Sequence, residues 1–218
     1  MSAEVDCGLY CHRWSNWQVK LINSIAQHTK SHQYAIHVVQ KRGNCHVNMG
    51  RLLRRFTAPY CVIMDEDALV LQDRWLDGLI WALEKDQTLG LVGCKDVKHE
   101  EEILRVQEPG QFTIRDTPWI PGFLMAFKRE RVEFLRPDEA IPGDMGMTDV
   151  DLCAQVRSQG LRVAVVPEII VYHPARDDDE TRRIEERPTL ARQEEWFPLQ
   201  QAYMREKWGD LFRRMTGR

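Results

Sequence analysis

The chain has 218 residues, of which 43% are hydrophobic and 29% charged, and its formal net charge is −3. This length favours a single domain with a sizeable core, and the slightly negative charge argues against a dedicated nucleic-acid binder, which usually carries a strongly basic domain. No apolar run approaches the roughly 20 residues that a membrane-spanning helix needs, and residues 1–8 lack the basic and apolar regions of a signal peptide.

The six cysteines are scattered along the chain, and Cys61, Cys94 and Cys153 lie within apolar segments. We therefore expect reduced thiols in a cytoplasmic protein. The alternative is a zinc site, although no C-x-x-C pair is present; its ligands would come from Cys7, Cys11, His12, Cys45 and His46.

Strands and helices alternate in the first half of the chain. Short β-branched or apolar runs predict the strands, and apolar residues at helical spacing predict the helices between them. This alternation is typical of an open, mostly parallel α/β sheet with helices on both faces, which binds ligands at the carboxyl ends of its strands. The predicted strands are 5–10, 34–39, 60–64 and 89–94, and the predicted helices are 16–27, 48–56 and 73–85.

The pattern changes after residue 94. Pro109-Gly110, between residues 103–106 and 112–115, predicts a small β-hairpin insertion. Thr148 is expected to cap a helix. A charge run predicts a solvated linker at 177–187, and a C-terminal helical tail follows. The remaining predicted elements are strands 122–127, 163–166 and 169–172, helix 148–158 and a helix pair within 196–215.

Three acids, Asp65-Glu66-Asp67, directly follow the strand 60–64. Like charges this close repel one another unless a cation lies among them. A hard divalent ion takes oxygen ligands and can bridge the oxygens of a diphosphate. The plainer alternative is an acidic turn in solvent.

Two later residues could serve chemistry with these acids. Asp149 falls in the first turn of helix 148–158, where the helix dipole favours a carboxylate, and a fixed carboxylate suits a general base for a hydroxyl. The alternative is that Asp149 and Asp151 only help to start the helix. His173 ends a strand and could complete a metal site, or it could be a plain surface residue.

The order of these features resembles the family 2 glycosyltransferases, which have the GT-A fold and include many rhamnosyltransferase-like enzymes. The likeness covers about Val5 to Pro174, and more loosely the tail. In this chain Asp65-Glu66-Asp67 corresponds to the family's D-x-D motif. The other matching segments are Asn48-Met49-Gly50, Gly90–Gly93, Gly122–Met125, Thr148–Cys153, Val171–His173 and Lys207-Trp208-Gly209.

The resemblance implies an inverting transfer of a sugar from a nucleotide-diphosphate sugar to an acceptor hydroxyl. Asp67 and His173 would bind Mn²⁺ or Mg²⁺, Asp65 would help through the metal or the donor ribose, and Asp149 would be the base. The metal would neutralise the leaving nucleoside diphosphate. The GT-A domain would span 1–176, divided into a nucleotide-sugar-binding half (1–94) and an acceptor and catalytic half (95–176), followed by linker and helices at 177–218.

Some positions depart from the family pattern. Thr148 replaces the usual acid before the base, and Gln40 stands where the family often has an Asp that reads the nucleotide base. Arg13 and Arg42 could contact the diphosphate or be solvated charges. The predicted donor-binding residues are Asp65, Glu66, Gln40, Arg42, Asn48 and Arg13, and the predicted acceptor-binding residues are Trp119, Gly122 and Asp144.

Other readings stay open. Clustered acids with a histidine also suit a metal-dependent phosphoryl-transfer enzyme or nuclease, and the fold could be a catalytically dead nucleotide-binding module. The acceptor could be a glycan, a lipid-linked molecule or a modified nucleic-acid base, the last because basic residues within 41–55 could steer a polyanion. The C-terminal helices could pack on their own domain, pair two copies in a homodimer, or lie on a membrane surface.

Overall fold

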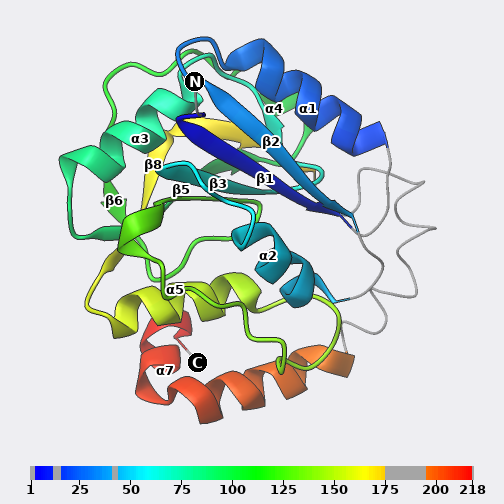
Figure 1. Ribbon diagram of the computed structural model, residues 1–218, viewed down its shortest axis with the longest axis vertical. Helices are drawn as coiled ribbons and strands as arrows, with labels where there is room; N and C mark the ends of the chain where they lie inside the picture. Colours follow the sequence, from blue (N-terminus) through cyan, green and yellow to red (C-terminus); the bar gives the residue numbers. More distant parts are fainter. Residues whose placement is uncertain (1–2, 12–15, 41–43, 175–194, 218) are drawn as a thin grey trace.

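The computed structural model describes residues 3–11, 16–40, 44–174 and 195–217, and it forms a sheet covered by helices on both faces (Figure 1). The sheet has eight strands. These are β1 (Val5–Cys11), β2 (Tyr34–Gln40), β3 (Tyr60–Asp65), β4 (Leu69–Val70), β5 (Leu89–Val97), β6 (Arg115–Asp116), β7 (Leu124–Lys128) and β8 (Arg162–Tyr172).

Five of these strands run in one direction. The spatial order is β2-β1-β3-β7-β5-β8-β4, with β6 paired to β8. β1 is parallel to β2 and β3, β5 is parallel to β8, and β7 runs antiparallel between β3 and β5. The predicted open, mostly parallel sheet is confirmed. Because β7 is antiparallel to both neighbours, β3 and β5 point the same way and end at the same edge.

Two hydrophobic cores lie on opposite faces of the sheet. Helices α1 (Asn16–His28) and α3 (Trp75–Lys85) cover one face, and α2 (Cys45–Leu53) and α5 (Thr148–Ser158) cover the other. Packing on the second face is close at Gly93 of β5, where an added Cβ would meet Ile120 at 1.9 Å. The shorter helices are α4 (Glu100–Ile103), η1 (Arg129–Arg131) and α7 (Asp210–Thr216), and residues 195–208 are also helical.

The predicted β-hairpin insertion is wrong. Residues 100–103 form α4, and β6 pairs with β8 instead of a hairpin partner. The loop carbonyls of 107–110 are bound by side chains from elsewhere. Gln72 donates to Gln107 O at 2.6 Å, and Arg74 donates to Pro109 O at 3.2 Å. Long-range side-chain contacts therefore replace the strand pairing that the Pro-Gly turn predicted.

Two local predictions also change. The strands predicted at 163–166 and 169–172 are one strand, β8, with a register shift opposite Cys94 and Lys95. Thr148 does not cap α5, because the N-cap position is Met147, in the left-handed region at φ 58°. The Thr148 hydroxyl is instead hydrogen-bonded to Nδ1 of the buried His46. That tertiary contact links the start of α5 to the start of α2.

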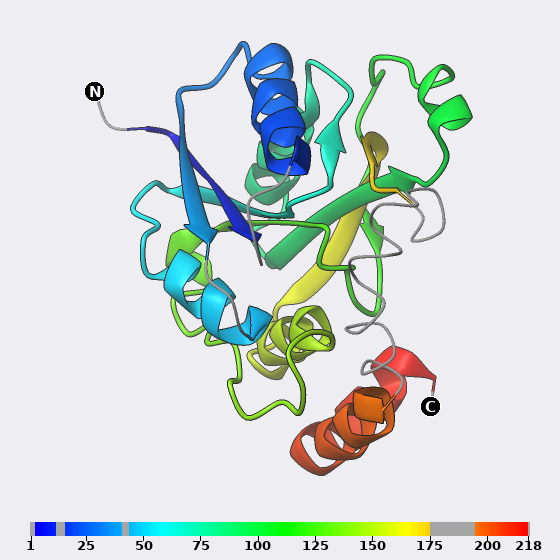
Figure 2. The same cartoon turned by 90° about the vertical axis from the view of Figure 1, so that its right-hand side faces the viewer.

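The C-terminal helices pack against α5, as Figure 2 shows. They are anchored by Asp151, whose side chain is fully buried. Asp151 accepts hydrogen bonds from Lys207 Nζ at 2.7 Å, Trp208 Nε1 at 2.8 Å and Gln155 Nε2 at 2.7 Å. Lys207 also lies 2.6 Å from Asp138. The predicted helical tail is thus confirmed as part of the second core. Within the described residues no helix is long and apolar enough to cross a bilayer.

The buried His46 predicts an acid-sensitive contribution to stability. Burial lowers the pKa of His46 to about 4, whereas an unfolded chain keeps it near 6.5. The folded state thus binds fewer protons than the unfolded state between these values, and stability is lost as pH falls through that window. We expect His46 to account for about 3 kcal/mol of lost unfolding free energy between pH 7 and pH 4.

Urea unfolding of the parent and of a His46→Gln variant across this pH range would measure the effect. The free energy of unfolding of the variant must be subtracted from that of the parent at each pH. The reason is that burial raises the pKa of Asp149 to about 6, which makes both proteins more stable as pH falls. The parent should lose stability relative to His46→Gln as pH falls. Parallel curves for the two proteins would show that His46 does not titrate in this way.

Candidate active site

The acid motif lies at the carboxyl edge of the sheet. Asp65 is the last residue of β3, and its backbone N–H donates to Phe123 O at 3.1 Å. Ala68 N–H donates back to Asp65 O at 3.2 Å, so the chain turns tightly after the strand. This turn buries Asp67, of which only 3% is exposed, and leaves Asp65 partly exposed.

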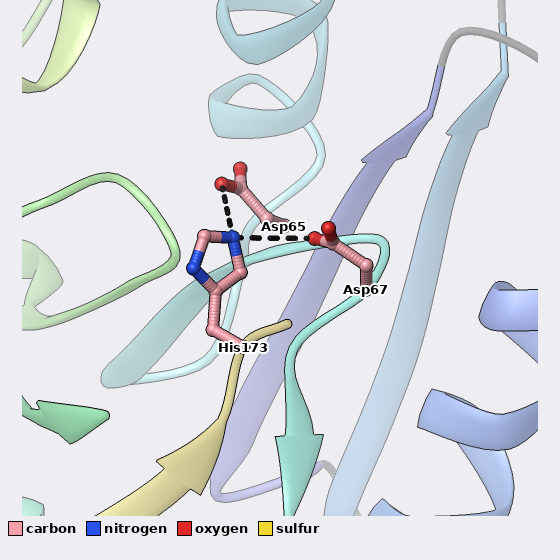
Figure 3. Close-up of side chains that lie close together, drawn as sticks. All are labelled: Asp65, Asp67 and His173. Atoms are coloured by element: carbon pink, nitrogen blue, oxygen red, sulfur yellow. Dashed lines mark ion pairs between the residues drawn. The ribbon is translucent and has the colours of Figure 1, made fainter. Parts of the chain in front are cut away.

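His173 reaches these acids from the other half of the sheet (Figure 3). Short strand β4 pairs with the end of β8, which brings the turn after Asp67 beside His173. His173 Nε2 lies 3.5 Å from Asp67 Oδ1 and 3.8 Å from Asp65 Oδ2. The ring of Phe123 stacks on the imidazole with a centroid distance of 5.2 Å. Two acids from one turn and a histidine more than a hundred residues later thus point toward one another.

Asp65, Asp67 and His173 fit a divalent cation. One ligand atom from each lies within 4.8 Å of the others. Carboxylate oxygens suit Mg²⁺ and Mn²⁺, and a neutral imidazole is a common further ligand for transition metals. Two carboxylates side by side, one of them buried, also favour a positive charge between them. We call these three residues the acid–histidine triad.

Asp149 lies on the same edge of the sheet, in the first turn of α5. Its Oδ2 accepts the Gly122 N–H at 3.1 Å, and its Oδ1 accepts the Val150 N–H at 2.9 Å. Burial raises the pKa of Asp149 to about 6, and the nearby charge of Asp65 acts in the same direction. The backbone hydrogen bonds oppose this rise because they stabilise the ionised form.

Tyr10 is a further residue of the site that the sequence prediction missed. Tyr10 lies opposite Asp65 in the β1–β3 pairing, and its hydroxyl donates to Asp65 Oδ1 at 2.5 Å. An added Cβ at Gly122 would lie 3.8 Å from the Tyr10 hydroxyl and 3.5 Å from Asp149 Cβ. Glycine at 122 therefore leaves space between these groups. The signal in the sequence is the end of the predicted first strand, which shares its edge with Asp65.

The structure separates the predicted donor-binding residues. Glu66 is hydrogen-bonded by Gln18 of α1, so its carboxylate is directed toward that helix. Asn48 is buried in α2 and accepts from Arg51 at 3.2 Å. Gln40 ends β2 at the same sheet edge with an exposed side chain, two strands away from β3. Arg13 and Arg42 lie outside the described residues.

The predicted acceptor-binding residues occupy three places. Gly122 lies directly against Asp149. Trp119 precedes β7 and is 36% exposed, so it is not a core tryptophan. Asp144 lies in the loop before α5, where its carbonyl accepts the Cys45 N–H at 2.7 Å. Of these three, only Gly122 is in contact with the candidate base in the described structure.

Asp96 and Lys98 are two further residues that the sequence prediction missed. Both lie at the carboxyl end of β5, and Asp96 forms an ion pair with Lys98. Lys98 Nζ lies 3.1 Å from His173 Nδ1, and Asp96 Oδ2 lies 3.9 Å from the same nitrogen. Their place beside His173 depends on the β5–β8 register, which the sequence does not reveal.

No known protein family and no curated protein matches the sequence. Solved structures do match. One is a mannosyltransferase, PcManGT from Pyrobaculum calidifontis, in complex with GDP-Man and Mn²⁺. Its TM-score is 0.59 at 22% sequence identity, and the match covers 82% of this chain and 59% of the mannosyltransferase chain. Another is GalNAc-T7 with UDP, GalNAc and Mn²⁺. Its TM-score is 0.63 at 12% sequence identity, and the match covers 81% of this chain and 44% of the GalNAc-T7 chain.

The chain has the GT-A fold. It spans little more than half the length of the mannosyltransferase and less than half that of GalNAc-T7. A third structure, A197 from STIV, has a TM-score of 0.55 at 14% identity and covers 79% of this chain and 86% of its own. The GT-A fold predicted from the resemblance is therefore confirmed, while identities this low establish the fold alone.

Proposed function

We propose that this protein is a metal-dependent glycosyltransferase that moves a sugar from a nucleotide-diphosphate sugar to an acceptor hydroxyl. The observation that carries the proposal is the convergence of Asp65, Asp67 and His173 at the carboxyl edge of a GT-A sheet. Open α/β sheets bind ligands at this edge. The two similar transferases were solved with Mn²⁺ and with GDP-Man or UDP, which supports the same ligand classes here.

In this proposal the triad and Asp149 would have different roles. The acid–histidine triad would hold Mn²⁺ or Mg²⁺, and a bound cation would stabilise the negative charge of the departing nucleoside diphosphate. Asp149 would accept the proton of the acceptor hydroxyl as the hydroxyl oxygen attacks the anomeric carbon of the sugar. The attack would come from the face opposite the departing nucleoside diphosphate, so the configuration of the anomeric carbon would be inverted. A pKa of about 6 leaves most of Asp149 ionised near pH 7, as a base requires.

We assign the donor to the half of the chain before residue 95 and the acceptor to the half that carries Asp149. The loop before α5 is held on both sides. Asn44 Nδ2 donates to Gly143 O at 3.1 Å, and the buried Gln200 donates to Pro142 O at 2.7 Å and to Met145 O at 2.6 Å. A loop fixed in this way suits acceptor binding, because positioning two substrates supplies much of the rate of a bimolecular reaction.

A thermal-shift screen tests the proposal. The protein would be heated with UDP-, GDP-, TDP- and ADP-linked sugars, each with and without Mn²⁺. A ligand present at 100 times its Kd stabilises the native state by about 2.7 kcal/mol, so one nucleotide sugar should raise the Tm clearly in the presence of Mn²⁺. The donor found would then be incubated with hydroxyl acceptors and assayed for nucleoside diphosphate release.

Matched variants give this screen its controls. Asp67→Asn should abolish the metal-dependent shift, because it removes a buried ligand of the triad. Asp210→Asn makes the same chemical change at an exposed residue of α7 and should leave the shift intact. Metal-dependent release of phosphate from a phosphodiester, with no response to any nucleotide sugar, would contradict a transferase and indicate hydrolysis.

A further inference from the structure

The second nitrogen of His173 faces a charged pair. His173 Nδ1 lies 3.1 Å from Lys98 Nζ and 3.9 Å from Asp96 Oδ2. β5 and β8 set this arrangement, because Asp96 pairs with Val171 and the His173 N–H donates to Val97 O at 3.0 Å. The imidazole therefore lies between two sets of groups, with the triad carboxylates at Nε2 and the Asp96–Lys98 pair at Nδ1.

The present contact fixes the proton of a neutral His173 on one nitrogen. The ammonium of Lys98 has three donors and no acceptor. At 3.1 Å it must donate to Nδ1, so the imidazole proton is on Nε2, where it faces Asp67 Oδ1 at 3.5 Å. A nitrogen that carries a proton has no lone pair for a cation. His173 is thus held in the tautomer that cannot bind metal through Nε2.

We propose that Asp96 is a positioning residue that selects the metal-binding tautomer of His173. When Nε2 is a ligand, the imidazole proton is on Nδ1, and metal-binding histidines almost always donate that proton to a carboxylate, a carbonyl or water. Asp96 Oδ2 is the carboxylate oxygen nearest to Nδ1 among the described ion pairs. The proton leaves Nε2 and an equivalent one is taken up at Nδ1 through solvent, so no net proton is gained or lost.

Lys98 must leave Nδ1 for this to occur. Its side chain is 45% exposed, so the ammonium can move outward while it stays paired with Asp96. The imidazole plane is kept in place by the buried ring of Phe123, which is stacked at 25° to it. Lys98 therefore competes with metal binding, whereas Asp96 supports it. The inference rests on the proposed function only in taking a divalent cation as the ligand of the triad.

Substitution of Asp96, but not of Lys98, should weaken Mn²⁺ binding in the full chain without nucleotide. The electron paramagnetic resonance signal of free Mn²⁺ would give the Kd of each variant. Asp96→Ala should raise the Kd about 10- to 100-fold, and Lys98→Met should leave it unchanged or lower it. Asp116→Ala, which removes an exposed strand carboxylate paired with Arg162, should bind as the parent does.

A spectroscopic measurement on the parent protein makes the test independent of whether any variant folds. In ¹⁵N-histidine-labelled protein, long-range ¹H–¹⁵N correlations report which ring nitrogen is protonated. We expect protonated Nε2 in His173 without metal and protonated Nδ1 with saturating Mg²⁺. Protonated Nε2 in the loaded protein would overturn the proposal, as would equal loss of Mn²⁺ binding in Asp96→Ala and Lys98→Met. Normal Mn²⁺ binding without any sugar transfer would contradict the proposed function and leave this inference standing.

Discussion

Replacement of Asp149 by asparagine is expected to lower the kcat of sugar transfer about 10²- to 10⁴-fold, the usual contribution of a positioned general base. Asparagine keeps the shape of the side chain and can still accept the Gly122 N–H, which lies 3.1 Å from Asp149 Oδ2 in the parent. It cannot take a proton from an acceptor hydroxyl. The loss should therefore appear in kcat, measured as initial rates at saturating donor and acceptor.

Binding should survive this substitution. Asp149 is not a member of the acid–histidine triad, so the Mn²⁺-dependent thermal shift with the donor should persist in Asp149→Asn. Asp210→Asn makes the same chemical change at an exposed acid of α7 and should keep a rate near that of the parent. A parental kcat in Asp149→Asn would remove Asp149 from the role of base.

The second large effect is expected on stability, at Asp151. Its buried carboxylate accepts hydrogen bonds from Lys207, Trp208 and Gln155. Removing one partner of a buried ion pair costs about 3–5 kcal/mol, because the remaining groups lose their compensation. We expect Asp151→Ala to lower the unfolding free energy by that amount in urea titrations. Because Lys207 keeps its contact with Asp138, the loss of unfolding free energy should lie toward the lower end of this range.

Asp210→Ala is the matched control for this change. Asp210 is 72% exposed and pairs with Arg213 on the surface of α7, and such pairs contribute roughly 0–1 kcal/mol. If Asp151→Ala destabilises the protein no more than Asp210→Ala does, the C-terminal helices are not anchored through Asp151.

The sequence predicted the open, mostly parallel sheet, and its resemblance to a known family named the residues of the triad as metal ligands. Buried strands are marked by short apolar runs, and the positions of Asp67 and His173 directly after such runs placed both at one edge of the sheet. The order of strands within the sheet was not needed for that argument. Parallel strands that point the same way end at the same edge, and the pairing of β4 with β8, which the sequence did not predict, brings Asp67 and His173 side by side.

The residues that the sequence did not reveal depend on register and on long-range contacts. Tyr10 lies against Asp65 only because β1 and β3 pair as they do, and Lys98 reaches His173 only through the β5–β8 pairing. Thr148 is of a residue type that often caps helices, but its hydroxyl is hydrogen-bonded to the buried His46. A short-range rule cannot anticipate a partner about a hundred residues away. The same holds for the Pro109-Gly110 loop, whose carbonyls are bound by Arg74.

The packing of the C-terminal helices has a practical consequence for dividing the chain. Met204, Phe212 and Met215 are buried in the same core as Leu152 and Val156 of α5. A fragment ending near residue 176 would expose to water the face of α5 that packs against these residues. Exposed apolar surface of this kind promotes aggregation. Fusions, swaps and trimmed expression clones of the catalytic part should therefore carry residues 195–217 with them, even though the sequence reads as a domain followed by an appendage.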